Sequence, residues 1–477
     1  MSRTRVALLL LIPATALCAA MLSAQASLPD TPSARQLGRW LATFNAADRE
    51  ARQQFVREHW PSRPNQNVDQ DMAFRDQTGG FNFLRVEEST PTRTIVLATE
   101  RDSDTVARLT MEVDPVEPHQ ILRFGAQAIP RPADLAIARL PEAELLSALR
   151  AELDRRAAGD RFAGAVLVAK DGKPIFTAAY GLSDRERKIP NTLETRFRNG
   201  SMNKMFTAVA VLTLVQAGKL AVDDPIGKHL TDYPNAALAS KVTVHHLLTH
   251  TGGTGDIFGP QFTARRLELR MHQDYLNLYG SRDLLFQPGS RWVYSNYGFV
   301  LLGALIEKVS GQSYYDYVRD HVYKPAGMLS TGSDPEDQPI ADRAIGYMKA
   351  PGSGTWQPNT NTLPYRGMAA GGGYTTVGDL LRFATALTGH KLLNPEYTSL
   401  LLTGKVQAGN GRYAYGFNDQ LIGGMRAVGH SGGAPGMNGD LVILPESGYV
   451  VAALANVDPP AAQRLSGFIA NRVPARP

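Results

Sequence analysis

The sequence contains very little cysteine. Cys18 is its one cysteine, and it lies in an N-terminal stretch that we expect to be removed, so the mature chain would hold no disulfide bond. The excess of positive charge is also small, because 50 lysine and arginine residues stand against 45 aspartate and glutamate residues. The chain has no dense lysine and arginine tract with interleaved aromatic residues, so the sequence gives little support for nucleic-acid binding.

The first 26 residues have the pattern of a secretory signal peptide. Arg3 and Arg5 give a positive start, an apolar run covers residues 6–17, and small residues occupy positions 24–26. This run is short for a bilayer span, and no other segment is apolar for long enough to cross a membrane. We therefore expect cleavage after Ala26, no stable membrane span and a periplasmic or secreted protein, with an uncleaved anchor as the alternative.

The mature chain is expected to form two domains. Residues 33–128 combine helix-forming sequence with four strand-like runs, which predicts a small α+β domain of unknown role. Prolines in residues 129–140 resist both helix and strand, and this segment is interpreted as a linker. The four strand-like runs are 81–86, 94–98, 107–113 and 121–124.

The second predicted domain covers residues 141–474 and belongs to the α/β class. It starts with a helix at 141–158 and a hairpin at 163–180, and it closes with a hairpin at 440–455 and a helix at 460–472. Strands near both ends with helices between them predict one antiparallel sheet, flanked by helices and joined to a helical subdomain. Another helix is expected from Met202 to Ala217, ended by Gly218.

The tetrapeptide Ser201-Met202-Asn203-Lys204 is the only S-x-x-K sequence in the chain. Residues three apart on a helix share a face, so the amine of Lys204 can reach the Ser201 hydroxyl. A serine hydroxyl needs a base to become a nucleophile, and an amine with a lowered pKa can take its proton. Taken alone, the tetrapeptide also fits a plain helix start, with Ser201 as the N-cap and a solvated lysine.

Two further motifs follow in order, Tyr294-Ser295-Asn296 and His430-Ser431-Gly432. Together with the S-x-x-K sequence they resemble the serine β-lactamase and penicillin-binding protein family, closest to its class C-like branch. That branch includes class C β-lactamases, D-Ala-D-Ala carboxypeptidases, D-amino-acid amidases and certain esterases. The segments 242–253 and 370–374 also look like sequence signatures of the family, and the resemblance covers about residues 160–470.

The resemblance implies a catalytic role for each motif. Ser201 would attack the substrate carbonyl, and Lys204 and Tyr294 would share the proton transfers, with Tyr294 passing a proton to the leaving group. Asn296 would hydrogen-bond the acyl side chain and help to hold Lys204.

The opposite wall of the cleft would come from the third motif. His430 would lie on the strand that forms this wall, and the backbone N–H groups of Ser201 and Gly433 would form the oxyanion hole. Many β-lactamases carry lysine where this chain has His430, and histidine is mostly neutral at pH 7. Capture of a penicillin or D-Ala carboxylate is therefore less favoured than hydrolysis of an ester, amide or peptide.

Two other hydrolase types are weighed against this interpretation. Residues 429–433 also match the G-x-S-x-G nucleophile elbow, but a loop follows Ser431 and no histidine occurs after His430. His246 and His250 have the spacing of a zinc pair, but Leu247 stands where that motif needs glutamate.

The sequence therefore predicts an exported serine hydrolase that works through an acyl-enzyme on Ser201, with no metal or cofactor and with a small-molecule or peptide substrate. A class C-like β-lactamase or D-Ala-D-Ala carboxypeptidase is the enzymatic alternative, and a catalytically silent wall-binding module is the non-enzymatic one. Five residues of the 254–287 segment are candidates for either the cleft wall or the core: Phe258, Phe262, Tyr275, Leu278 and Tyr279.

Overall fold

The computed structural model describes residues 27–63, 68–349 and 354–475. The predicted signal peptide, 1–26, lies outside the described residues. Within the described ranges, every helix is too short or too polar to cross a bilayer.

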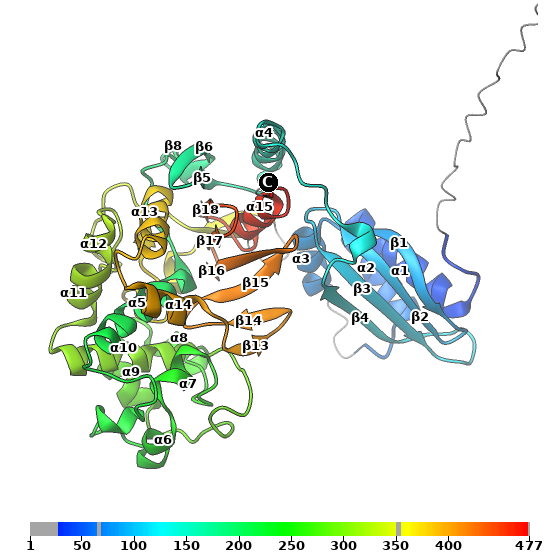
Figure 1. Ribbon diagram of the computed structural model, residues 1–477. Helices are drawn as coiled ribbons and strands as arrows, with labels where there is room; N and C mark the ends of the chain where they lie inside the picture. Colours follow the sequence, from blue (N-terminus) through cyan, green and yellow to red (C-terminus); the bar gives the residue numbers. More distant parts are fainter. Residues whose placement is uncertain (1–26, 64–67, 350–353, 476–477) are drawn as a thin grey trace, which may run out of the picture.

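The N-terminal unit is a four-stranded antiparallel sheet with three helices (Figure 1). Its α1 helix is capped by Thr31 and buries Leu37, Trp40 and Phe44 against the sheet, at the spacing of one helix face. The helix-forming sequence at the start of this unit makes two helices, because Ala47 adopts a left-handed conformation and Asp48 caps the second one. The elements are α1 (Pro32–Ala46), α2 (Arg49–His59), α3 (Asp69–Thr78), β1 (Phe81–Ser89), β2 (Arg93–Glu100), β3 (Val106–Val113) and β4 (Ile121–Ile129).

The second unit is built on an eight-stranded antiparallel sheet in the order β13-β14-β15-β16-β17-β18-β5-β6. Strands β18 and β5 pair directly, with Ala452 opposite Leu167, so hairpins from the two ends of the domain meet in one sheet. This confirms the predicted fold class. The strands are β5 (Gly164–Lys170), β6 (Lys173–Tyr180), β13 (Val406–Ala408), β14 (Gly411–Tyr413), β15 (Asn418–Ile422), β16 (Met425–Ala434), β17 (Met437–Leu444) and β18 (Tyr449–Ala455).

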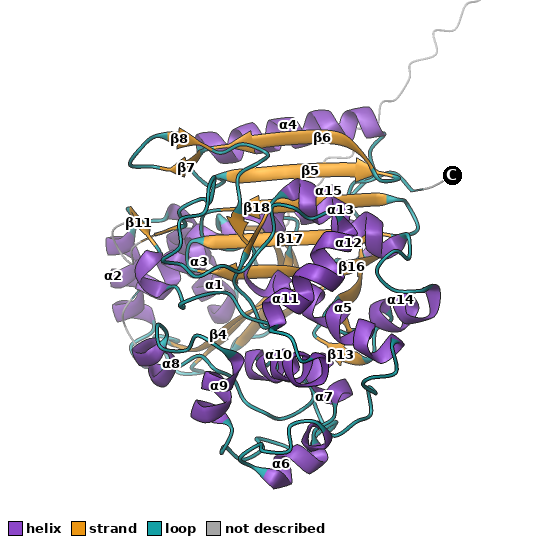
Figure 2. Ribbon diagram, turned by 90° about the vertical axis from the view of Figure 1, so that its left-hand side faces the viewer, coloured by secondary structure: helices purple, strands orange, loops and turns teal. Residues whose placement is uncertain are grey.

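Helices cover both faces of this sheet (Figure 2). Strand β5, which lies between β18 and the edge strand β6, is apolar at successive positions because each of its faces packs on a different layer. Val166 and Val168 pack with α4 (Glu142–Ala158) and α15 (Ala461–Ala470), whereas Leu167 packs on the side of α5 (Asn203–Gln216) and α13 (Val377–Thr388).

A helical subdomain lies beyond α5. Helix α5 is buried along most of its length because it lies between the sheet and this subdomain, and it ends shortly before Gly218, which has a positive φ of 66°. Phe262, Tyr275 and Tyr279 belong to the core, whereas Phe258 is exposed. The helices are α6 (Ala236–Lys241), α7 (Val244–Leu248), α8 (Pro260–Arg265), α9 (His272–Tyr279), α10 (Asn296–Ser310), α11 (Tyr314–Val318), α12 (Lys324–Ala326) and α14 (Pro395–Leu402).

Candidate active site

Ser201 lies in a short 3-10 turn, Gly200–Met202, that leads into α5, and Lys204 lies in the first turn of that helix. The Lys204 amine is 3.2 Å from the Ser201 hydroxyl oxygen. Ser201 does not cap α5, and Lys204 is completely buried rather than solvated. The plain helix-start interpretation of this tetrapeptide is therefore wrong.

The surroundings of Lys204 favour a neutral amine. Burial lowers its pKa from the ordinary 10.5 to about 7, although the charge of Asp256 opposes this change. The amine donates to the Asn296 carbonyl oxygen at 2.8 Å and to the carbonyl oxygen of Ala370. A neutral amine has two N–H groups, so these two acceptors use both and leave the lone pair for the Ser201 O–H.

Tyr294 lies next to the same two groups. Its hydroxyl is hydrogen-bonded with Ser201, and its ring centroid is 4.7 Å from the Lys204 amine. Burial raises the pKa of Tyr294 above its ordinary value, and the Ser201 hydrogen bond offsets only part of this increase. The phenol therefore stays protonated at neutral pH, which suits a proton donor better than a general base.

Asn296 is held by a carboxylate that the sequence analysis did not single out. The Asn296 backbone N–H donates to Asp256 Oδ1 at 3.1 Å, and its side-chain Nδ2 donates to Asp256 Oδ2 at the same distance. The amide can then present only its oxygen to Lys204. The position of Asp256, just after the 242–253 signature, was the one sequence signal that could have pointed to it.

Replacing Asp256 by asparagine is expected to reduce kcat by about tenfold to a hundredfold, because a positioning partner of a catalytic group is lost. The acidic limb of the pH profile should also move to lower pH, since the carboxylate charge raises the pKa of Lys204. The pH dependence of kcat/KM for a p-nitrophenyl ester measures both effects. Asp283→Asn is the charge-matched control at an exposed position, and an unshifted profile in Asp256→Asn would contradict the assigned role.

His430 lies on β16 and belongs to a chain of hydrogen bonds in the cleft wall. Its Nε2 is 3.0 Å from the Tyr413 hydroxyl, which is 3.1 Å from Nε2 of His250. The backbone N–H of Ser295 donates to His250 Nδ1, so His250 Nε2 carries the proton and donates to Tyr413. Tyr413 in turn donates to His430, whose Nδ1–H donates to the Ser431 carbonyl oxygen.

Both imidazoles in this row of hydrogen bonds, those of His250 and His430, are neutral. Burial, and then the nearby positive charge of Lys204, lower the pKa of His430 to about 3, and the same causes lower the pKa of His250 well below its ordinary value. Tyr413 and the role of His250 were not predicted, because no short motif joins either residue to its partners. The alternative of a zinc pair of His246 and His250, which the sequence did not favour, has no support among the described contacts, since His246 Nδ1 accepts from the Thr243 N–H and His250 Nδ1 from the Ser295 N–H.

A cavity of about 250 Å³ opens beside Ser201. The backbone of β16 lies against the Gly200–Met202 turn so closely that a Cβ on Gly200 would lie 2.9 Å from the Gly433 nitrogen. This approach brings the backbone amides of Ser201 and Gly433 to one side of the cavity, as an oxyanion hole requires. Asn296 is not among the lining residues, which are Ser201, Trp292, Tyr294, Tyr413, Asn418, His430, Ser431 and Gly433.

The chain belongs to the Beta-lactamase family, whose model matches residues 148–473. It is 31% identical to Penicillin-binding protein 4* of Bacillus subtilis over 295 residues, which cover 58% of this chain and 64% of that protein. It is 36% identical to Esterase EstB of Burkholderia gladioli over 207 residues, which cover 40% of this chain and 53% of the esterase. These matches span less than two thirds of either relative.

A solved structure agrees with this assignment. The penicillin-binding protein from Bacillus halodurans is 35% identical and superimposes with a TM-score of 0.61, over 66% of this chain and 98% of that structure. The second unit of this chain therefore has the fold of the β-lactamase-related serine hydrolases, and the family match leaves the N-terminal unit out.

Proposed function

We propose that this protein is an exported serine hydrolase that forms an acyl-enzyme on Ser201 and acts on an ester, amide or peptide. The observation that carries this proposal is the buried Lys204 amine, which lies 3.2 Å from the Ser201 oxygen with both N–H groups engaged by carbonyl oxygens. Such an amine can accept the serine proton at neutral pH. The signal-peptide pattern of residues 1–26 supports the proposed export.

The proposed reaction has two halves. Ser201 attacks the carbonyl carbon while Lys204 takes its proton, and the N–H groups of Ser201 and Gly433 stabilise the oxyanion. Tyr294 gives its proton to the leaving oxygen or nitrogen and recovers one from Lys204. Water then attacks the acyl group through the same proton path, which releases the acid and restores the Ser201 hydroxyl.

The neutral state of His430 supports a substrate whose reacting end carries no carboxylate. A carboxylate taken into this cleft would meet an imidazole without charge, so it would lose its hydration without gaining an ion pair. The similarity to Esterase EstB supports the same choice, and the similarity to Penicillin-binding protein 4* keeps a β-lactamase or carboxypeptidase activity as the second candidate.

A labelling experiment and a substrate panel test this proposal. After incubation with a fluorophosphonate, mass spectrometry of the digested full chain should find the adduct on the peptide that contains Ser201. The panel contains p-nitrophenyl esters, D-amino-acid amides and nitrocefin, and we expect the esters to give the largest kcat/KM. An unlabelled protein without turnover would favour the catalytically silent wall-binding module instead.

Replacing His430 by lysine is expected to raise the ratio of nitrocefin to ester kcat/KM by about tenfold, because a cation would then face the substrate carboxylate. The two substrates are compared by initial rates at one ionic strength. His390→Lys places the same charge on an exposed residue outside the cleft and serves as the control. A ratio that rises equally in both variants would show that the neutral imidazole does not set this preference.

A further inference from the structure

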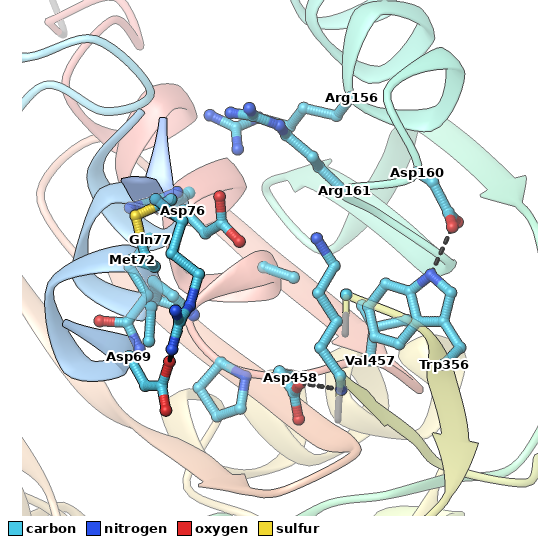
Figure 3. Close-up of a pocket in the computed structure, with 18 residues that line it drawn as sticks. Asp69, Met72, Asp76, Gln77, Arg156, Asp160, Arg161, Trp356, Val457 and Asp458 are labelled. Carbon is cyan, nitrogen blue, oxygen red and sulfur yellow. Dashed lines mark hydrogen bonds and ion pairs between the residues drawn. The ribbon is translucent and has the colours of Figure 1, made fainter. Parts of the chain in front are cut away.

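A second cavity, of about 460 Å³, lies between the N-terminal unit and the hydrolase domain. Helix α3 forms one wall. The opposite wall comes from the end of α4, the paired strands β10 (Tyr347–Lys349) and β11 (Trp356–Pro358), and the start of α15. Its volume falls in the range of ligand pockets, which often form at domain interfaces. Figure 3 shows Met72, Asp76 and Gln77 on the first wall facing Arg156, Arg161 and Trp356 on the second.

Two cations of this cavity lack a hydrogen-bonded carboxylate among the described residues. The Arg464 side chain is only 10% exposed, and the carboxylate paired with it, Glu100, is 3.7 Å away. Lys349 makes no ion pair with a described residue, and its amine lies 5.4 Å from the ring centroid of Trp356. By contrast, Arg156 and Arg161 are already paired with Glu152 and Asp102, respectively.

Most carboxylates in the lining are already engaged. Asp160 accepts from Arg185 and from the Trp356 indole N–H. Asp458 accepts the backbone N–H groups of Gly436 and Lys349. On the wall formed by the hydrolase domain, Arg464 and Lys349 therefore have no hydrogen-bonded carboxylate among the described residues, while Asp160 and Asp458 are occupied.

The electrostatic surroundings of Arg464 also favour the binding of an anion. Burial lowers the pKa of Arg464 to about 10, Glu100 opposes that change, and the charges of Arg156 and Arg161 add to the lowering. A bound anion would reduce this repulsion. Part of the lining is apolar and includes Met72, Trp356, Val457, Pro459 and Pro460, so an anion alone would leave this part of the cavity unfilled.

We propose that this interdomain cavity binds a small carboxylate that carries an aromatic or aliphatic body. Arg464 and Lys349 hold the carboxylate, and Trp356 with Pro459 and Pro460 contacts the body. The site is separate from the catalytic cleft but adjoins it, because Pro459 packs against Gly433, where a Cβ would lie 2.8 Å from the proline ring. It also gives the N-terminal unit a binding role that the family match does not cover.

Calorimetric titration of the full chain with N-benzoylglycine tests the proposal, since this probe has an aromatic body and one carboxylate. We expect saturable binding, and at least about tenfold weaker binding of the uncharged N-benzoylglycinamide. Arg464→Gln and Lys349→Gln should each weaken binding of the acid by about tenfold. Arg155→Gln is the matched control, because Arg155 belongs to the same arginine cluster but does not line the cavity.

A substitution on the opposite wall makes the location of the site testable without touching the cation cluster. Ala73 is an exposed residue of α3 that lines the cavity. Ala73→Glu should weaken binding of the acid, whereas the similarly sized but neutral Ala73→Gln should bind it nearly as wild type does. Equal affinity in Ala73→Glu and Ala73→Gln, equal affinity of acid and amide, or no saturable binding at millimolar probe would each overturn the proposal.

Discussion

Replacing Ser201 by alanine is expected to lower kcat/KM for a p-nitrophenyl ester by about 10⁴-fold to 10⁶-fold, as loss of a nucleophile does in other serine hydrolases. The substitution removes one oxygen from a half-buried side chain, so the fold should be unchanged. Steady-state kinetics give the rate, and mass spectrometry after fluorophosphonate treatment should find no adduct on this variant.

Ser431→Ala is the control for this experiment. Ser431 lines the same cavity and is the serine of the competing G-x-S-x-G interpretation. The position of Ser431 already disfavours the nucleophile-elbow interpretation, because this residue lies within the strand β16 rather than on a turn that leads into a helix. If the fluorophosphonate adduct were lost from Ser431→Ala and retained in Ser201→Ala, the acyl-enzyme assignment would be wrong.

Replacing Lys204 by methionine is expected to reduce kcat by a factor comparable to that of Ser201→Ala, because the two groups act on one proton. Methionine is unbranched and of similar length, so it can fill the buried space of the lysine stem. In the wild type, activity should rise with pH through the Lys204 pKa of about 7, as the amine loses its proton. The residual activity of the variant should lack this rise.

The double variant Ser201→Ala with Lys204→Met separates this role from a structural one. Groups that act as a unit are not additive, so the double variant should be no slower than either single variant. Lys308→Met on α10 is the control, since Lys308 is exposed and distant in sequence from the motif. A rise of activity through the same pH range in Lys204→Met would contradict the assignment of this pKa to the general base.

The same lysine should make stability depend on pH. Its pKa is about 7 in the folded chain and near 10.5 in the unfolded chain, so between these values the unfolded chain binds one more proton. The free energy of unfolding should therefore rise as pH rises from about 7 to about 10.5. The contribution of Lys204 to stability is least favourable below about pH 7. Lys204→Met removes the dependence, and its gain in Tm over the wild type should be larger at about pH 6 than at about pH 10.

The sequence predicted the β-lactamase-related fold because its signals are local. Each hairpin and helix of the hydrolase domain depends on patterns within about twenty residues, and the predicted ends of α4 and α5 agree with the structure to within one or two residues. The S-x-x-K spacing is likewise local, since one helical turn brings Ser201 and Lys204 together whatever the rest of the chain does.

The rest of the site depends on contacts between distant segments. Asp256 acts through Asn296, and Tyr413 links His250 to His430, over separations that no periodicity or short motif encodes. The interdomain cavity depends even more on contacts between distant segments, because α3 and α15 contribute to it from opposite ends of the chain.

By itself the sequence determined the fold class, the family and the order of the three motifs. Only the tertiary structure decided the charge states, that is, a lysine near neutrality and two uncharged histidines. The physical reason is that a pKa depends on burial and on the partners of each group, and both are set by packing rather than by neighbours in the chain.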